Sequence, residues 1–549
     1  MTEFVKPLVQ GYAPACPHSA GRERLLSCEH SNRHSHAHTG ATTWKAADMM
    51  TSTTGGDNHN VVQFPKSAEE RRAHRKAKEA LEKQRLINVF IDEVGGDKAL
   101  FHTRDDIAYA DLIIAGHRET WQVRSKQFRH AYLRYLQRQF DRLVGEDEPL
   151  MAVALKAAMN KTAVNHAIDD FERRAVCSAT TRDVHVRIAG LVGELYIDLC
   201  NDDWTCVRIT AGGWSIIDSP PVRFKRTDGM LPLPIPERNG KIEALRPFLN
   251  ATDSDFTLAV AYLLAALYSH GPYPILILYG EQGTAKTAFL RKLRMFVDPH
   301  LADTTAPPSS GRDLFISAAN SHMLCFENVS KLSDAMSDDL CRLATGGSHR
   351  TRKLFKDSDE VYFRGGRPIA FEGISNVVSR PDLQSRAIIF QLESLPQYRS
   401  EDELDPAFER LRPAIFGALL DLLQRGLEKL PVTQVVSPPR MAFFTKWAVA
   451  CGVNDFEAHY RANLQNATNV MLAHDSLAKA VRALVAKKPF AGDMEDLLNV
   501  VGAATGIKST KKLSDEFRRL MPALRTVGVH VVFEQRKAEY RGFRIELRK

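Results

Sequence analysis

The sequence contains no apolar run long enough to cross a bilayer. Its longest apolar stretch, from Phe256 to Tyr268 and again from Tyr273 to Tyr279, is broken by Ser-His-Gly-Pro. A membrane-spanning helix needs about 20 consecutive apolar residues. The segment MTEFVKPLVQGYAPAC also lacks a charged region followed by an apolar one, so no signal peptide is expected. The sequence therefore predicts no membrane partner.

Cysteine is scarce as well. Eight cysteines occur in 549 residues, and most stand alone in apolar segments, as Cys177, Cys325, Cys341 and Cys451 do. Disulfide frameworks are typical of small secreted chains in which cysteine is dense. Isolated thiols predict a reducing compartment, and we expect a cytoplasmic protein.

Charge of one sign is not in large excess either. Lys and Arg number 74 and Asp and Glu 66, which gives a net charge of +8, and the chain is 26% charged and 44% hydrophobic. This composition excludes a chain that is mostly disordered or fibrous. At about 150 residues per domain, the length predicts three or four folded units. The mild basic excess permits a polyanionic partner without requiring one.

The N-terminal region has little apolar periodicity. Residues 1–62 are rich in Ser, Thr, His, Gly and Asn, which predicts a disordered tail. A zinc site is the alternative, although the spacing of the ligand-type residues fits no usual zinc finger. These residues are Cys16, His18, Cys28, His30, His34, His36 and His38. Residues 63–99 are predicted to be a basic helical segment, because strong helix formers alternate there with dense charge.

Residues 100–247 are predicted to form an α+β domain that contains a small β module. Apolar residues repeat at helical spacing from Ser125 to Leu143. Cations on the other face of this helix either follow a phosphate backbone or face solvent: Arg124, Lys126, Arg129, Arg134, Arg138 and Arg142. Short β-type runs between Val184 and Pro234 predict the module.

Three carboxylates in this module are of the kind that a metal centre uses: Asp198, Asp202 and Asp203. They lack the paired D-x-D spacing that two-metal chemistry needs. Turn carboxylates are the favoured interpretation.

A glycine-rich loop follows the β-type run ILILY and precedes a helical segment, AFLRKLRMFV. The loop consists of Gly280, Glu281, Gln282, Gly283, Thr284, Ala285, Lys286 and Thr287. In this order, backbone N–H groups and the helix N-terminus face a phosphate, the lysine reaches the β and γ phosphates, and the threonine hydroxyl ligates Mg²⁺. Ala285 stands where the general pattern has its last glycine. The loop predicts ATP and Mg²⁺ as cofactors.

This loop and three later segments resemble the D5-like and superfamily 3 helicase-type P-loop ATPases of bacteria, prophages and mobile elements. The segments are GPYPILILYGEQGTAKT, RDLFISAANSHMLCFENVS, SDAMSDDLCRLATGG and RPDLQSRAIIFQL. The resemblance extends from about Phe101 to the C-terminus and is densest between Gly271 and Leu392. The loop is also similar to that of minichromosome-maintenance helicases, which tolerate Ala at the same place. The resemblance implies an AAA+ motor, a homo-oligomeric ring that binds ATP between subunits and moves single-stranded DNA through a channel.

Two acids are candidates for the catalytic centre. Glu327 and Asn328 end a predicted strand where the resemblance implies a Walker B motif, so Glu327 either holds the metal together with Thr287 or acts as the base. Asn328 cannot accept a proton in either role. Glu372 stands where the family carries a sensor asparagine, so it either replaces the missing Walker B acid or alters sensing. Both interpretations stay open, and Asn376 is a weaker substitute for the sensor.

Arg386, in SRPDLQSRAIIF, occupies a position that resembles the arginine finger of ring ATPases. A guanidinium stays charged and bridges two phosphate oxygens of a neighbouring subunit's nucleotide, which implies an oligomer. A structural salt bridge is the alternative, and Arg380 is a second candidate close by in the sequence.

Residues 346–366 are predicted to form a hairpin, which in the resembled motors lines the channel. Its cationic residues are the expected contacts for single-stranded DNA: His349, Arg350, Arg352, Lys353 and Lys356. A solvated hairpin is the alternative.

Helical patterns follow, and Arg412 within them is a candidate second sensor. The last segment is predicted to be a winged helix that contacts either duplex DNA or a protein. Its cations are Arg518, Arg519, Arg536, Lys537 and Arg541.

The fold class predicted is α/β, a P-loop AAA+ core over residues 248–395 with a helical lid over 396–470 and a winged-helix-like domain over 471–549. The predicted function is an ATP-binding ATPase that acts on DNA, a helicase or replication-initiation motor of a phage or mobile element. The alternative is a nucleotide-gated DNA-binding or defence scaffold with little hydrolysis. ATPase assays with and without single-stranded DNA separate the two.

Overall fold

A computed structural model describes most of the chain. The described residues are 67–96, 98–145, 155–347, 349–352, 360–363, 365–374, 380–395, 400–533 and 542–548. The predicted tail over 1–62, its candidate zinc ligands, Lys353, Lys356, Asn376, Arg536, Lys537 and Arg541 lie outside them. The chain divides into two units, Met1–Glu70 and Arg71–Lys549, and the contacts described here belong to the second.

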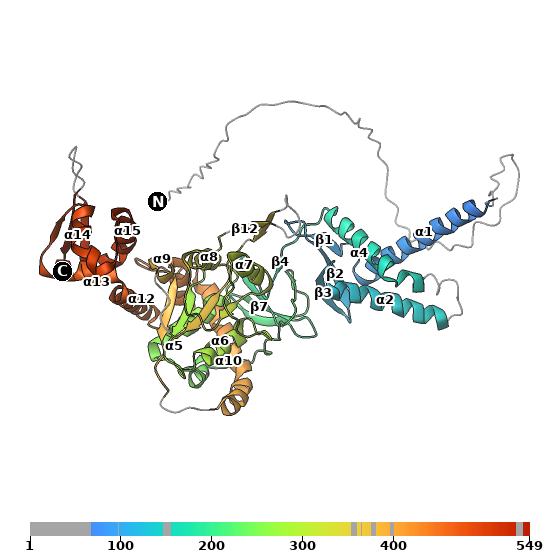
Figure 1. Ribbon diagram of the computed structural model, residues 1–549. Coiled ribbons are helices and arrows are strands. Elements are labelled where there is room, and N and C mark those ends of the chain that lie inside the picture. Colours follow the sequence, from blue (N-terminus) through green and yellow to red (C-terminus); the bar gives the residue numbers. More distant parts are fainter. Residues whose placement is uncertain are drawn as a thin grey trace, which may run out of the picture. The chain divides into compact units, whose positions relative to one another are not determined.

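Three helices and a small antiparallel sheet form the first folded part. The helices are α1 (Ala68–Val94), α2 (Lys126–Gly145) and α4 (Lys161–Val176), and the sheet contains β1 (Leu100–His102), β2 (Ala108–Ile114) and β3 (His117–Gln122) (Figure 1). Phe90 of α1 lies 5.1 Å from Tyr132 and 5.6 Å from Phe171 between ring centroids. The apolar stripe of α2 is therefore core.

The basic side of α2 is partly engaged within this same part of the fold. Arg124 forms an ion pair with Asp169 at 3.0 Å, and Arg129 donates to Asn165 at 2.7 Å. Asp169 and Asn165 both belong to α4. At least these two cations therefore contribute to helix packing rather than facing solvent alone.

A four-stranded antiparallel meander forms the β module. Its strands are β5 (Ile188–Leu191), β6 (Glu194–Asp198), β7 (Cys206–Thr210) and β8 (Gly213–Ile217), and β4 (Val184–His185) pairs with β9 (Arg223–Phe224) beside it. Asp198 is buried, accepts the N–H of Cys200 at 3.0 Å and pairs with Arg226 at 2.7 Å. Within the described residues, no group of three or more His, Cys, Asp or Glu side chains could hold a metal ion. Asp198 therefore serves as the ion-pair partner of Arg226 and accepts a backbone N–H from the turn after β6.

A buried ion pair joins the β module to the segment after α6 (Lys286–Val297). Arg187 and Asp298 are both 0% exposed, and the Arg187 Nε lies 3.0 Å from the Asp298 carboxylate. The second oxygen of Asp298 accepts the N–H of His322 at 2.8 Å. Burial alone would raise the pKa of Asp298, but Arg187 and His322 together hold this pKa below its usual value.

The central sheet is parallel and has the order β11-β14-β10-β15. Its strands are β11 (Leu324–Phe326), β14 (Ile369–Gly373), β10 (Ile275–Tyr279) and β15 (Ala387–Gln391). Side chains alternate between two cores, as the period of a strand requires. Leu276 and Leu278 belong to the core with α5 (Asp253–Ala266) and α6, whereas Ile275 and Ile277 belong to the core with α7 (Gly311–Asn320) and α8 (Asp334–Ala344). Helices on both faces are what a buried parallel sheet requires.

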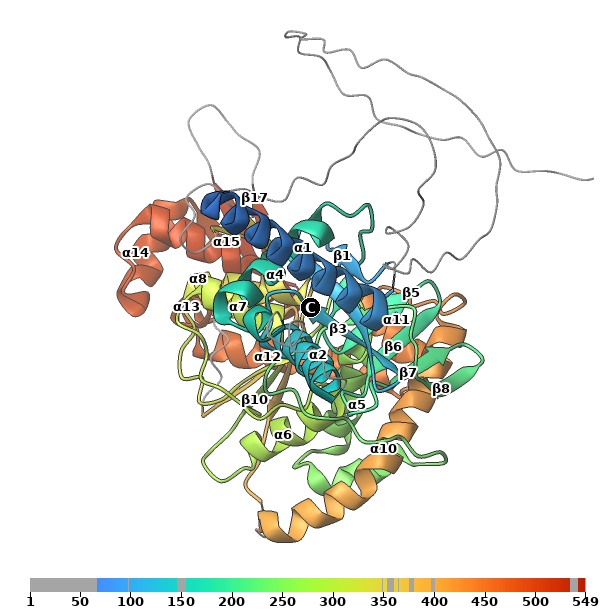
Figure 2. The ribbon, with the colours of Figure 1, turned by 90° about the vertical axis from the view of Figure 1, so that its right-hand side faces the viewer.

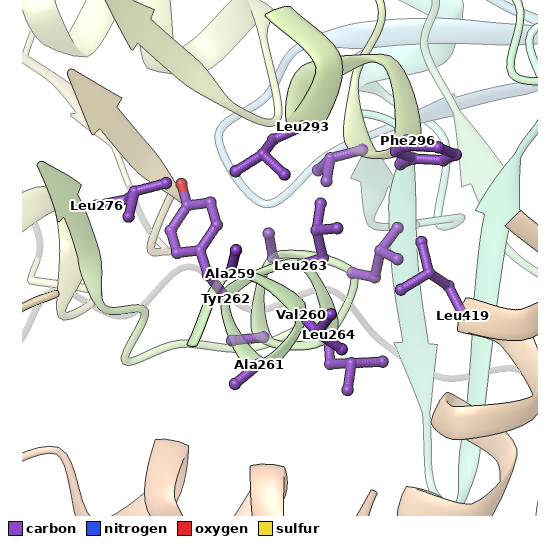
Figure 3. Close-up of a cluster of buried hydrophobic side chains, with 14 of the residues drawn as sticks. Ala259, Val260, Ala261, Tyr262, Leu263, Leu264, Leu276, Leu293, Phe296 and Leu419 are labelled. Atoms are coloured by element: carbon purple, nitrogen blue, oxygen red, sulfur yellow. The ribbon is translucent and has the colours of Figure 1, made fainter. Parts of the chain in front are cut away.

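Helix α5 is buried almost all round, because nearly every residue from Phe256 to Ala266 is apolar. Figure 3 shows Tyr262 and Leu263 of α5 close to Leu276 of β10 and Leu293 of α6. Leu419 packs in the same core. It belongs to the long helix α10 (Glu401–Lys429), which is drawn in orange in Figure 2. This packing fixes the position of the loop between β10 and α6.

Helices dominate the remaining chain. They are α11 (Ala442–Ala450), α12 (Phe456–His474), α13 (Ser476–Lys487), α14 (Met494–Thr505) and α15 (Thr510–Thr526), and β16 (Phe490–Gly492), β17 (Val529–Phe533) and β18 (Phe543–Leu547) form a sheet of order β16-β18-β17. Helical patterns over 476–486 and 510–520, followed by two β-type runs, predict α13, α15 and the final hairpin, whereas α14 and β16 are not among the predicted elements. None of the helices in the described ranges has the length and apolarity needed to span a membrane.

Candidate functional site

The glycine-rich loop lies at the carboxyl end of β10 and leads directly into α6. Gly283 has a φ of 84° and Ala285 a φ of 59°. A Cβ at Gly280 would lie 2.5 Å from the carbonyl oxygen of Leu392, so only glycine fits there. The helix N-cap is Ala285, whose side chain makes no capping bond. The first N–H groups of α6 therefore have no side-chain acceptor at the N-cap, which leaves them available to an anion.

Ala285 is the residue that departs from the general loop pattern, and its backbone explains why glycine is usual there. Its φ of 59° and ψ of 31° lie in the left-handed region. This conformation costs an L-residue about 1–2 kcal/mol. The loop keeps its shape with Ala285, so the departure is compatible with the loop geometry.

Lys286 folds back over the loop. Its Nζ donates to the carbonyl oxygens of Gly280 at 2.9 Å and Glu281 at 2.7 Å, and it lies 3.3 Å from the Thr284 hydroxyl. The residue is only 8% exposed. A phosphate in the loop would replace these carbonyls as acceptors for the ammonium group.

Glu372 lies beside Thr287. It stands near the end of β14, where it is the register partner of Leu278 in β10. Its Oε1 accepts the Thr287 hydroxyl at 3.3 Å and the Asn328 N–H at 3.2 Å, and the residue is 4% exposed. Among the described residues Glu372 has no ion-pair partner, although buried charges are normally paired or coordinate a metal.

Glu327 follows β11 and has a different neighbour. Its Oε2 accepts the Thr304 hydroxyl at 2.7 Å, and its N–H donates to the Thr305 carbonyl at 2.9 Å. Thr287, which is predicted to share a metal with Glu327, instead donates to Glu372. The role of Glu327 stays a prediction, and of the two acids Glu372 is the one that contacts the loop threonine.

Arg386 is engaged by an acid of its own chain. It pairs with Asp382 of α9 (Pro381–Gln384) at 2.5 Å, and Arg440 pairs with the same carboxylate at 2.7 Å. Burial raises the pKa of Asp382, but these two guanidinium groups hold it below its usual value. Arg380 forms an ion pair with Asp338 at 3.0 Å. Both Arg386 and Arg380 therefore have structural partners, and a role as arginine finger stays a prediction.

The predicted second sensor, Arg412, is also paired. It donates to Glu409 on its own helix at 2.8 Å and to the carbonyl of Pro232 at 3.2 Å. These contacts join α10 to the chain that follows the β module.

A hairpin forms where the basic cluster is predicted. Strand β12 (His349–Arg352) pairs antiparallel with β13 (Glu360–Phe363), with Arg350 opposite Tyr362 and Arg352 opposite Glu360. Lys353 and Lys356 lie outside the described residues. The DNA contact stays a prediction.

Asn250 is a residue of the site that the sequence did not indicate. Its side-chain amide donates to the carbonyls of Thr284 at 3.0 Å and Glu393 at 2.8 Å. It thus ties the loop to the chain after β15. Nothing in the local sequence around Asn250 points to this contact, because both partners are distant in the chain.

Residues 242–470 match a family model described as the actinomycete integrative conjugative element replication protein. This segment contains the loop, Glu327, Glu372, the hairpin and Arg386. The match supports a replication-associated protein of a mobile element. No curated protein matches the chain.

Solved structures of the NrS-1 C-terminal region are similar to this chain at low sequence identity and low TM-score. The A form apo structure is 13% identical, covers 63% of this chain and 94% of its own, and has a TM-score of 0.32. A second apo structure of the same region is 13% identical with the same coverages and a TM-score of 0.30.

Proposed function

We propose that this chain is an ATP-dependent DNA motor of the P-loop AAA+ type, a helicase or replication-initiation ATPase of a mobile element. The observation that carries the proposal is the arrangement of Lys286 and Thr287 at the start of α6 with Glu372 buried beside Thr287. The family match to replication proteins over the same segment supports it. The winged-helix interpretation of the C-terminal part belongs to this proposal.

The residues present fit a nucleotide with its Mg²⁺. The loop amides and Lys286 would hold the phosphates, because the N-terminus of α6 has no side-chain cap. Hard cations prefer oxygen ligands, and the Thr287 hydroxyl and the Glu372 carboxylate supply them. When bound, Mg²⁺ neutralises charge that develops on the phosphates.

In this proposal Glu372 and Glu327 have different roles in ATP hydrolysis. Glu372 orients the Thr287 hydroxyl, and Glu327, held by Thr304, is the candidate base that would accept a proton from the attacking water. Asn250 positions the loop backbone. Arg386 would act on a neighbouring subunit's nucleotide only after its pair with Asp382 opens.

The alternative is a nucleotide-gated DNA-binding scaffold that hydrolyses ATP poorly. It is favoured by the pairing of Arg386 with Asp382 and by the single acid at the end of β11. Steady-state ATPase measured with and without single-stranded DNA separates the two, because DNA stimulates a motor and leaves a scaffold near zero.

Lys286→Ala tests the nucleotide site itself. We expect this variant to lose ATP binding and keep its fold, because the Lys286 ammonium contacts the loop and not the hydrophobic core. Binding of a fluorescent ATP analogue measures the first property and circular dichroism the second. Undiminished nucleotide affinity in the folded variant contradicts the P-loop assignment.

A further inference from the structure

A cavity that contains no residue of the glycine-rich loop lies next to the base of the hairpin. Its volume is about 830 Å³, which falls within the range of sites for small ligands. The hairpin contributes residues from both of its ends, Gly346 before β12 and Gly365 after β13. The other walls come from the loop between β1 and β2, from β4 and from α7.

Cations outnumber acids in the lining. The arginine and lysine side chains are Arg104, Lys225, Arg312 and Arg367, and the acids are Asp105 and Asp183. The Arg104 Nε lies 3.6 Å from the Asp183 carboxylate, so these two charges form an ion pair. The balance of four cations against two acids leaves the cavity positive, and the histidines of the lining add no negative charge.

Two of these cations have no side-chain partner in the part of the chain that the structure describes. Neither the Lys225 ammonium nor the Arg312 guanidinium has a hydrogen bond or ion pair with another described residue, and Lys225 is partly buried beside Arg367. Burial, followed by the charge of Arg367, lowers the pKa of Lys225 to about 8. Arg367 is fixed by the carbonyls of Ala318 at 2.8 Å and Ser321 at 3.0 Å. A buried ammonium without a counter-charge is costly, so an anion in the cavity would stabilise it.

The same cavity has an apolar side. Ile107 is 38% exposed and Ile316 is 46% exposed, and both line it. Such side chains offer a flat apolar contact to a ligand that carries a base as well as a phosphate.

We propose that this cavity binds a nucleotide unit, with its phosphate on Lys225 and Arg312 and its base against Ile107 and Ile316. The source of the nucleotide is either a single strand that meets the hairpin or a free nucleoside monophosphate. Only the first source rests on the proposed function, and separate titrations with a strand and with a mononucleotide distinguish the two.

The first test is binding of a fluorescent oligo(dT) strand, measured by anisotropy over a range of salt concentrations. Removing one phosphate contact to a single strand reduces the slope of log K against log salt by about 0.7. Lys225→Gln/Arg312→Gln removes both cations from the one phosphate, so we expect it to reduce this slope by about 0.7. The matched control is Lys241→Gln/Arg410→Gln, because these cations are exposed and lie outside the cavity. The control should leave the slope unchanged.

Two further variants separate charge from apolar contact. Lys225→Arg keeps the charge and should restore most of the slope that Lys225→Gln removes. Ile107→Ser/Ile316→Ser should weaken strand affinity about fivefold with an unchanged slope, because an apolar contact releases no counterion. Circular dichroism and urea unfolding establish that each variant is folded. An unchanged affinity in the serine variant contradicts the base contact.

The second test is calorimetric titration with dTMP and with inorganic phosphate. Loss of dTMP binding in the glutamine variant, with an unchanged strand slope, identifies a free nucleotide as the ligand. Binding of inorganic phosphate as tight as that of dTMP overturns the base contact. The whole proposal is overturned if the glutamine variant has an unchanged strand slope and either binds dTMP as the wild type does or the wild type itself does not bind dTMP. The ATP-analogue binding that Lys286→Ala removes, measured in parallel, reports on the glycine-rich loop, so failure of the proposed function shows separately.

Discussion

Glu327 and Glu372 are both candidates for the acid of the nucleotide site, and their contacts differ. Glu372 accepts the hydroxyl of Thr287, whereas Glu327 accepts that of Thr304. If Glu327 is the base, Glu327→Gln should lower ATP turnover at least about tenfold. The reason is that general base catalysis typically contributes about a hundredfold or more to the rate. Glu372→Gln should instead weaken the Mg²⁺ dependence of ATP binding, because it removes a charged oxygen ligand.

Turnover and Mg²⁺ titrations of the two variants measure these effects separately. An unchanged turnover in Glu327→Gln would move the base to another residue, with Glu372 the next to test. Thr304→Val is a useful companion variant, since it removes the hydroxyl that holds Glu327 and leaves the acid itself in place.

His322 gives a prediction for the pH dependence of stability. It is 3% exposed, its Nε2 lies 2.8 Å from the Ala266 carbonyl, and burial followed by the charge of Arg367 lowers its pKa to about 4. The folded state therefore favours neutral His322, and the unfolded state takes up the proton first as pH falls. Above about pH 6.5, neutral His322 makes its full contribution to the free energy of unfolding. As pH falls from there towards 4, this contribution is lost, and the loss is at most about 3 kcal/mol.

Urea unfolding between pH 7.5 and 4.5 measures this effect, with His322→Gln as the comparison. Glutamine retains an amide donor for Ala266 and does not titrate, so the variant should lose less stability over this range. Parallel pH profiles for the two proteins would rule out His322 as the source.

At the scale of elements, the basic hairpin separates a motor from a protein that merely binds ATP. The β12–β13 ribbon carries Arg350 and Arg352, and Lys353 follows β12 in the sequence. We expect Arg350→Ala/Arg352→Ala/Lys353→Ala to bind ATP normally, because the glycine-rich loop is a separate element. The variant should lose DNA-stimulated hydrolysis and strand separation, because contacts between cationic side chains and phosphates bind the single strand.

A forked-duplex unwinding assay and ATPase with single-stranded DNA measure these losses. Unwinding at the wild-type rate would show that the hairpin is a surface feature and that the channel assignment is wrong.

Elements whose sequence pattern is local are the ones that can be predicted. The continuous apolar run of α5 and the strand, loop and helix around Lys286 appear where the sequence indicates. Strand β11 covers only the last three residues of the run 321–326 that predicts it, and β16 has three residues and therefore little periodicity of its own. Helix α14 has 12 residues, as many as α13, and its capping box at Asp493 is a local signal from which it can be predicted. The contact of Thr287 with Glu372 joins residues 85 positions apart, so it depends on the order of strands in the sheet.

At the scale of the whole molecule, the Arg187–Asp298 ion pair makes the β module and the parallel sheet depend on each other. Arg187→Met leaves a buried carboxylate without its counter-charge, which should cost about 3–5 kcal/mol in the free energy of unfolding. Arg187→Met/Asp298→Asn should recover part of this loss, because the amide is neutral and its oxygen still accepts the His322 N–H.

Urea unfolding monitored by tryptophan fluorescence measures both variants, since Trp214 belongs to the β module. Equal stabilities for the single and the double variant would show that the charge of Asp298 is compensated by other groups.

The same ion pair bears on how this gene can be rearranged. The segment that matches the replication-protein family begins at residue 242, and Arg187 is encoded upstream of it. A recombination event that transferred only residues 242–470 would carry Asp298 without its arginine. Mobile elements that exchange such cassettes should therefore inherit the β module together with the sheet, or acquire a neutral residue at the position of Asp298 in the same lineage.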